Sequence, residues 1–112
     1  MTSTLEHLTI DCADAAKLAA FWAAVLDQPI VPGGSAEYAF VKGSPGWMFL
    51  QVPEPKVVKN RMHADFATDD LPAEVARLVA LGATLVADHS EHGATWATLT
   101  DPEGNEFDVV AS

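Results

Sequence analysis

Cysteine and long apolar runs are scarce in this sequence, and each scarcity excludes a class of protein. Cys12 is the single cysteine among 112 residues, so the chain forms no internal disulfide and nothing points to an oxidising compartment. The longest apolar stretch, residues 15–26, falls short of the about 20 residues that span a bilayer. The first eleven residues lack the basic region and apolar core of a signal peptide. We therefore expect a soluble cytoplasmic protein.

Basic residues are also few. Six Lys and Arg face sixteen Asp and Glu, which gives a formal net charge of −10. Proteins that bind nucleic acids or anionic membranes need cations to meet the phosphates, so neither partner is expected here. An acidic surface can attract cationic small molecules. By itself, however, the charge mostly indicates solubility.

The hydrophobic content is high enough for a folded core. Hydrophobic residues make up 49% of the sequence, which is typical of a globular protein rather than a disordered one. A chain of 112 residues has the usual length of one domain. We therefore expect a single domain over residues 1–112.

The same order of predicted elements occurs twice. Residues 4–12 alternate as a strand, and a helix follows from Asp14 as N-cap. The second half restarts with a strand and a helix, which has Asp70 as N-cap and Gly82 as C-cap. The predicted strands are 4–12, a weak one near Ile30, 37–43, 47–53, 61–68, 83–88, 94–101 and 105–110.

Polar landmarks of the two halves lie in register. His63 follows His7 by 56 residues (63 − 7), and Asp70 follows Asp14 by 56 (70 − 14). Gln51 is matched by Asp108 at 57 residues (108 − 51). A repeat of this length indicates a duplicated supersecondary unit. We predict two tandem βαβββ modules, residues 1–56 and 57–112.

This pattern resembles the vicinal oxygen chelate (VOC) superfamily. The segments IDCADAAKLAAFWAAVL, QVPEPKVVKNRMHADF, EVARLVALGAT, EHGATW and DPEGNEF are similar to recurrent segments of a glyoxalase-like subgroup. The resemblance implies an α+β fold in which curved mixed sheets surround a cleft, with helices outside. It also implies a homodimer. The superfamily includes glyoxalase I, extradiol dioxygenases and bleomycin-resistance proteins, so the fold alone does not name a reaction.

The resemblance also implies a metal site. The family's ligand positions fall on His7, Gln51, His63 and Asp108, and this donor set suits Zn, Ni, Fe or Mn. In such members the ion binds two neighbouring substrate oxygens, while a carboxylate such as Asp108 moves the proton. The chain departs from the family pattern in two places. Glutamate is commoner at the position of Asp108, and Gln51 is a neutral ligand.

The strand over residues 61–68 places two chemically active side chains on one face. Alternation puts Arg61, His63 and Asp65 together, and Met62, Ala64 and Phe66 on the opposite face. Asp65 is a candidate substrate-binding residue. The alternative is that this face is simply solvated, as one side of an antiparallel sheet commonly is.

Aromatic side chains suggest a second kind of site. Trp47 and Phe49 share a strand face with Gln51, and we expect all three to face the cleft. Trp96, and with weaker support Tyr38, are further candidates. Such a lining suits a flat or apolar ligand. The alternative is that these residues fill the cleft or a dimer interface.

The segment 88–93, DHSEHG, holds two further histidines. With Glu91, His89 and His92 resemble a metal cluster, but a short loop without a second anchor is better explained as solvated. The family resemblance places His92 at the cleft rim.

Two functions from different classes remain open. The first is a metal-dependent lyase, isomerase or dioxygenase that acts on a small oxygenated molecule. The second is a metal-free protein of the bleomycin-resistance type that binds an aromatic or cationic compound. The paired histidines favour the enzyme, whereas the acidic charge and the aromatic residues favour the binding protein.

Overall fold

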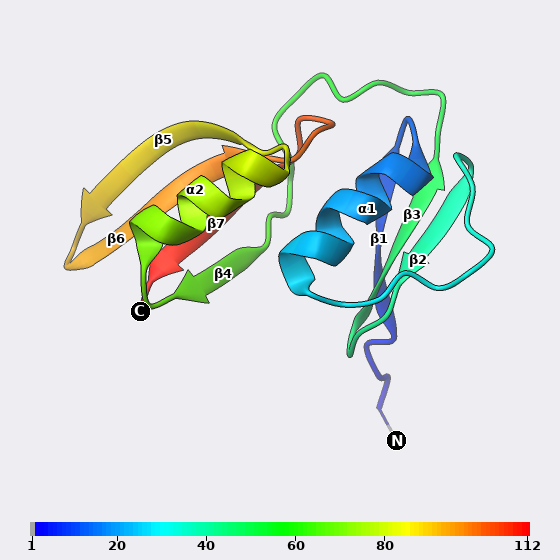
Figure 1. Cartoon of the computed structure of the whole chain (residues 1–112), viewed down its shortest axis with the longest axis horizontal. Helices are drawn as coiled ribbons and strands as arrows, with labels where there is room; N and C mark the ends of the chain where they lie inside the picture. The colour runs from blue at the N-terminus through cyan, green and yellow to red at the C-terminus, as the bar shows by residue number, and fades with distance from the viewer. Residues whose placement is uncertain (1) are drawn as a thin grey trace. The chain divides into compact units, whose positions relative to one another are not determined.

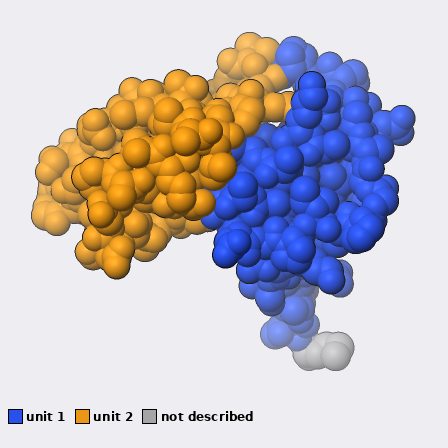
Figure 2. All heavy atoms as spheres, in the orientation of Figure 1, with its two compact units in different colours: residues 1–55 blue, residues 56–112 orange. Residues whose placement is uncertain are grey.

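The chain divides into two compact units. The computed structural model describes residues 2–112, and the units are Met1–Pro55 and Lys56–Ser112 (Figure 2). Within the described residues, each unit consists of one helix and one mixed sheet (Figure 1). This is the α+β architecture that the sequence predicts. No helix within residues 2–112 combines the length and the apolar character needed to cross a membrane.

Unit 1 has the element order βαββ over the described residues. Its elements are β1 (His7–Cys12), α1 (Ala15–Leu26), β2 (Tyr38–Val41) and β3 (Gly46–Gln51). The sheet order is β1-β3-β2, with β1 parallel and β2 antiparallel to β3. The further strand expected near Ile30 is only a single bridge to Val41. Pro29 and Pro32 flank this residue and lack the N–H groups that a longer ladder would need.

Helix α1 begins directly after the N-cap that the sequence predicts, Asp14. The Asp14 side chain accepts a hydrogen bond of 3.1 Å from the Lys17 N–H, which satisfies a free donor of the first turn. The chain leaves the helix at Asp27 in the left-handed region, with φ of 51°. The side chains that α1 buries are those of Ala15, Leu18, Ala19, Phe21 and Trp22. These side chains form the apolar face that packs on β2 and β3.

Unit 2 contains one helix and four strands among its residues. They are β4 (Asp65–Thr68), α2 (Leu71–Leu81), β5 (Thr84–Glu91), β6 (Ala94–Thr100) and β7 (Glu106–Ala111). The sheet order is β4-β7-β6-β5, with β4 parallel to β7 and the other pairs antiparallel. Asp70 caps α2 by accepting from the Ala73 N–H at 3.1 Å, and Gly82 ends the helix with φ of 125°. Both caps are as predicted.

Strand β4 is shorter than the strand expected over residues 61–68. It begins at Asp65, and Met62, which was expected on the apolar face, is 80% exposed. The Ala64 carbonyl nevertheless accepts a hydrogen bond of 3.0 Å from the Asp108 N–H. The backbone is thus already held against β7 immediately after His63.

The segment 88–93 is part of a β-hairpin rather than a solvated loop, which corrects the expectation. Strand β5 continues through His89 to Glu91, and β6 starts at Ala94. The turn is His92-Gly93, with positive φ values of 51° and 79°. Two residues with positive φ match the twist of the flanking strands. His89 therefore has a fixed place in the sheet.

Alternation gives the sheet of unit 2 an apolar face and a polar face. Ala97, Leu99, Phe107 and Val109 are at most 1% exposed, and α2 packs on strands β5, β6 and β7. The neighbouring positions point the other way. The polar face of unit 2 therefore carries the following side chains, together with His63 just before β4: Asp65, His89, Trp96, Thr98 and Asp108.

Candidate functional site

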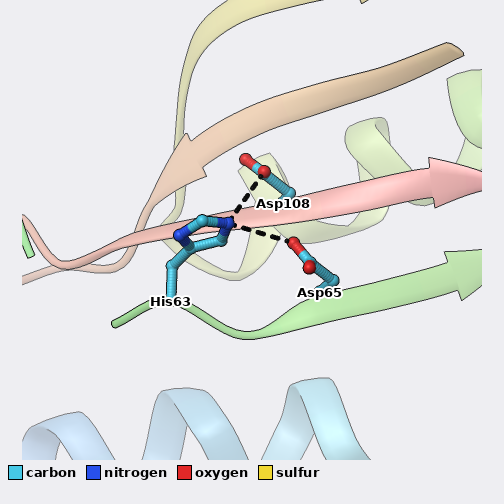
Figure 3. Close-up of side chains that lie close together, drawn as sticks. All are labelled: His63, Asp65 and Asp108. Atoms are coloured by element: carbon cyan, nitrogen blue, oxygen red, sulfur yellow. Dashed lines mark ion pairs between the residues drawn. The ribbon is translucent and has the colours of Figure 1, made fainter. Parts of the chain in front are cut away.

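Three potential metal ligands meet on the polar face of unit 2. The Nε2 atom of His63 lies 3.3 Å from Oδ1 of Asp65 and 3.3 Å from Oδ2 of Asp108 (Figure 3). One donor atom from each residue lies within 4.8 Å of the other two. The pairing register explains the arrangement, because Asp65 on β4 is directly opposite Asp108 on β7. His63 precedes Asp65 by two residues, so it projects to the same side. We call these three residues the His63 cluster.

The two distances from His63 in the His63 cluster match the donor spacing of a bound ion. Ligands at about 2.1 Å from a tetrahedral metal stand about 3.4 Å apart. The two distances from His63 are 3.3 Å each. A divalent ion could therefore replace the proton on Nε2 with little movement of the three side chains. One imidazole and two carboxylates would leave further coordination positions for substrate or water.

The two carboxylates of the cluster differ in exposure. The Asp65 side chain is 60% exposed, whereas that of Asp108 is 18% exposed. Thr98 donates a hydrogen bond of 2.7 Å to Oδ1 of Asp108, which leaves Oδ2 directed at His63. Asp108 is therefore the fixed carboxylate, and Asp65 is the accessible one.

The segment that leads to His63 is tied down by Glu106 of β7. The Asn60 backbone N–H donates to the Glu106 carboxylate at 3.1 Å, and the Asn60 side-chain amide donates to the Glu106 carbonyl at 3.1 Å. Lys56 forms an ion pair of 3.2 Å with the same carboxylate. The Asn60 hydrogen bond, with a smaller contribution from Lys56, lowers the pKa of Glu106. The approach to His63 is thus anchored at neutral pH.

An aromatic pair lies on the same face as the His63 cluster. The rings of His89 and Trp96 are stacked, with centroids 4.9 Å apart and planes inclined by 18°. His89 Nε2 lies 3.2 Å from the Thr98 hydroxyl. Of the aromatic candidates, Trp96 therefore shares its sheet face with Asp65, as a ligand-binding role requires.

In unit 1, His7 and Tyr38 lie on the sheet face opposite α1. His7 is half-buried, and its ring contacts Phe40 edge to face, with centroids 5.8 Å apart. Tyr38 is 46% exposed and pairs with Leu50. By alternation Thr9 and Asp11 share this face of β1 with His7, so it carries an imidazole and a carboxylate beside apolar neighbours such as Phe40 and Leu50.

The expected correspondence between Gln51 and Asp108 is wrong. Asp65, the counterpart of Thr9 (65 − 9 = 56), pairs with Asp108, whereas Thr9 pairs with Met48. Met48 therefore occupies the position that Asp108 has in unit 2. Gln51 pairs instead with Cys12, and its side-chain amide donates a hydrogen bond of 2.9 Å to the Ala13 carbonyl. His7 pairs with Gly46, and Gln51 lies five residues further along β3. This offset corresponds to about 16 Å, so His7 and Gln51 do not converge.

Trp47 and Phe49 lie on the helix side of their sheet, which corrects the expected orientation. Phe49 is 0% exposed and pairs with Ile10 on the apolar face of β1. The Trp47 ring lies 4.9 Å from that of Trp22 in α1. The two residues do share a face with Gln51, but α1 covers that face. Phe49 is a core residue of unit 1, and Trp47 is partly buried against α1.

Two residues beside the cluster carry signals that the sequence interpretation did not use. Thr98 shares a face with Trp96 by simple alternation along the predicted strand 94–101. His89 was assigned to a loop, although Gly93 after His92 is compatible with a two-residue hairpin turn. Extending the preceding strand to that turn places His89 opposite Trp96.

The fold and the site together define the class of protein. A mixed sheet with one helix on one face, occurring twice, is the VOC type of fold that the sequence resembles. The family model described as glyoxalase-like domain matches residues 7–110, nearly the whole chain. The chain belongs to this glyoxalase-like family. A comparison with curated proteins found no match.

Solved structures with the same fold come from several bacteria. A glyoxalase/bleomycin resistance protein/dioxygenase family enzyme from Burkholderia phytofirmans PsJN is 21% identical, with a TM-score of 0.79 and coverage of 96% of this chain and 98% of that one. A mutant of the fosfomycin resistance protein FosX from Listeria monocytogenes, complexed with Mn(II) and 1S,2S-dihydroxypropylphosphonic acid, is 16% identical (TM-score 0.80; coverage 100% and 92%). Lactoylglutathione lyase from Agrobacterium tumefaciens is 19% identical (TM-score 0.67; coverage 97% and 93%). At these identities the likeness concerns the fold.

Proposed function

We propose that this protein is a small-molecule metalloenzyme whose divalent ion is bound by His63, Asp65 and Asp108. The observation that carries the proposal is the separation of 3.3 Å between His63 Nε2 and each carboxylate, which suits donors around one ion. The net charge of −10 adds an attractive field for a cation.

The donor set favours a borderline or hard divalent ion. Imidazole suits Zn, Fe and Ni, and carboxylate suits Mn, so these four metals are the candidates. The Mn(II) complex of the FosX structure supports the choice, because that chain has the same fold. Mn and Zn serve as the two test ions, one suited to the carboxylates and one to the imidazole.

The cluster residues would divide the chemical work. A bound ion supplies a Lewis acid that polarises substrate oxygens. Asp108, partly buried and held by Thr98, suits a fixed ligand. Asp65, 60% exposed, has an oxygen accessible to substrate and suits a proton acceptor. The reaction would be of lyase, isomerase or dioxygenase type on a small oxygenated molecule, and Asp108, the catalytic residue expected from the family, would act through the ion.

Metal titration of matched variants tests the proposal. We expect metal-stripped, untagged protein to take up about one Mn²⁺ or Zn²⁺ per chain, measured by calorimetry. His63→Ala and Asp108→Asn should weaken binding at least about tenfold, since each removes a ligand. His92→Ala and Asp69→Asn are controls, because both residues are exposed outside the cluster. Absence of uptake by the wild type, or equal loss in the controls, would contradict the proposal.

The family resemblance also implies ligand roles for His7 and Gln51, and these roles stay predictions. His7 lies on the face of its sheet away from α1, which is compatible with a ligand, whereas the Gln51 amide is engaged by Ala13. In the same titration, His7→Ala should weaken binding if His7 is a ligand, and Gln51→Ala should not.

A second candidate function is metal-free binding of an aromatic or cationic compound. It is favoured by the stacked pair of Trp96 and His89 on the face that carries two carboxylates. Such a protein would be indifferent to chelators. A flat cationic ligand should then quench tryptophan fluorescence in the wild type and not in Trp96→Ala, with or without added metal.

Pairing of two chains is a further prediction from the family resemblance. We expect sedimentation equilibrium to give about twice the chain mass of 11.9 kDa. A mass of one chain at micromolar concentration would contradict it.

A further inference from the structure

Outside the His63 cluster, Thr98 holds the second oxygen of Asp108, and His89 in turn contacts Thr98. The Thr98 hydroxyl donates to Asp108 Oδ1 at 2.7 Å, and His89 Nε2 lies 3.2 Å from the same hydroxyl oxygen. A hydroxyl has a single proton to donate. Because Asp108 receives that proton, the N–H of the second bond must belong to His89 Nε2. The hydrogen bonds therefore run in one direction, from His89 to Thr98 to Asp108.

His89 is itself held on two sides. It is paired with Trp96 across the β5–β6 ladder, and the two rings are stacked at 4.9 Å. Its Nε2 reaches diagonally to Thr98, the next residue of β6 on this face. The imidazole is half-buried. This combination of stacking and hydrogen bonding fixes both the position and the donating nitrogen of the ring.

We propose that Thr98 and His89 are positioning residues that orient the Asp108 carboxylate for metal binding. This inference rests on the proposed function of the His63 cluster. With Oδ1 engaged by Thr98, Oδ2 stays directed at His63, at 3.3 Å. Without the hydroxyl, the carboxylate could rotate about its terminal bond, and the ion would have to restrain it on binding. Partners that orient a metal ligand typically contribute 10–100-fold to affinity.

Substitutions of Thr98 separate this role from a structural one. Valine has nearly the same shape and the same preference for strands, but it cannot donate a hydrogen bond. Serine keeps the hydroxyl. If Thr98 serves only the sheet, Thr98→Val should bind metal like the wild type. If it positions Asp108, Thr98→Val should lose affinity and Thr98→Ser should retain it.

The decisive experiment is calorimetric titration of Mn²⁺ and Zn²⁺ into the metal-stripped full chain. We expect Thr98→Val to raise Kd by about 10–100-fold, Thr98→Ser to stay within about threefold, and His89→Ala to fall between them. Thr95→Val is the matched control, because Thr95 is an exposed threonine of the same strand. An unchanged Kd in Thr98→Val beside metal binding by the wild type would overturn the inference and leave the proposed function intact.

A metal-free readout separates the inference from the proposed function. The ring ¹⁵N signals of His63, recorded at one pH without metal, report the carboxylate at 3.3 Å. We expect these signals to shift in Thr98→Val and to stay in place in Thr95→Val. If they shift while the wild type binds no ion, the positioning stands and the metal function fails. If the signals stay in place in Thr98→Val, the hydroxyl does not orient the carboxylate and the inference is refuted as well.

Discussion

Replacement of Phe49 tests which sheet face of unit 1 is core. Phe49 is 0% exposed, lies opposite Ile10 and Ala39, and shares its face with Trp47, which contacts α1 through Trp22. Truncation of a fully buried phenylalanine to alanine costs about 3–5 kcal/mol of unfolding free energy. That is a large part of the about 5–15 kcal/mol that stabilises a typical domain. We therefore expect Phe49→Ala to be severely destabilised.

A graded series keeps the test informative if Phe49→Ala does not fold. Phe49→Leu keeps most of the volume and should cost about 1.5 kcal/mol or less. Trp96→Ala is the contrast, because Trp96 is only half-buried and its truncation should cost less than that of the fully buried Phe49. Urea unfolding followed by far-ultraviolet circular dichroism measures all three without relying on tryptophan signals.

The two possible roles of Phe49 give different results. If Phe49 is a core residue, Phe49→Ala loses more unfolding free energy than Phe49→Leu, and Phe49→Leu retains ligand or metal binding. A cost below about 1 kcal/mol for Phe49→Ala, together with weaker binding, would refute the assignment to the core. Phe49 would then face a ligand rather than the core.

Two further predictions concern local stability. Glu106→Gln removes a carboxylate whose pKa is lowered chiefly by the Asn60 N–H. Its contribution is present above the ordinary glutamate pKa and lost as pH falls through the lowered value. The unfolding free energies from urea titration should therefore differ by about 1 kcal/mol at neutral pH. They should converge as pH falls through the lowered pKa, whereas a difference that is constant with pH would contradict this. Asp70→Ala should lower the unfolding free energy by about 1 kcal/mol, because it removes the N-cap of α2. Asp70→Asn should cost less, since asparagine can also cap a helix. If thermal unfolding shows equal losses for both variants, the capping bond is excluded.

The local signals in the sequence were sufficient for the helices and for the class of fold. Asp14 and Asp70 cap helices because an aspartate oxygen can accept from an N–H three residues ahead, and both bonds form. Gly82 ends a helix because it tolerates positive φ. These interactions join residues close in the chain, so the sequence alone determines them. The family match over residues 7–110 agrees with that assignment.

The proximity of His63 and Asp65 was also visible in the sequence, because residues two apart on an extended chain project to the same side. The addition of Asp108 was only implied by the family. The distance of 3.3 Å between Asp108 Oδ2 and His63 Nε2 depends on the parallel register of β4 and β7. The link from His89 through Thr98 likewise depends on the register of β5 and β6.

Tertiary structure decided which face each strand presents and which residues lie opposite one another. Both faces of residues 47–51 carry large apolar side chains, so alternation could not show that α1 covers Trp47 and Phe49 rather than Met48 and Leu50. Counting along the repeat matched Gln51 with Asp108, whereas pairing matches Met48 with it. The physical reason is that a shift of one residue in register moves every side chain of a strand to the other face. Register is settled by contacts between residues far apart in the sequence.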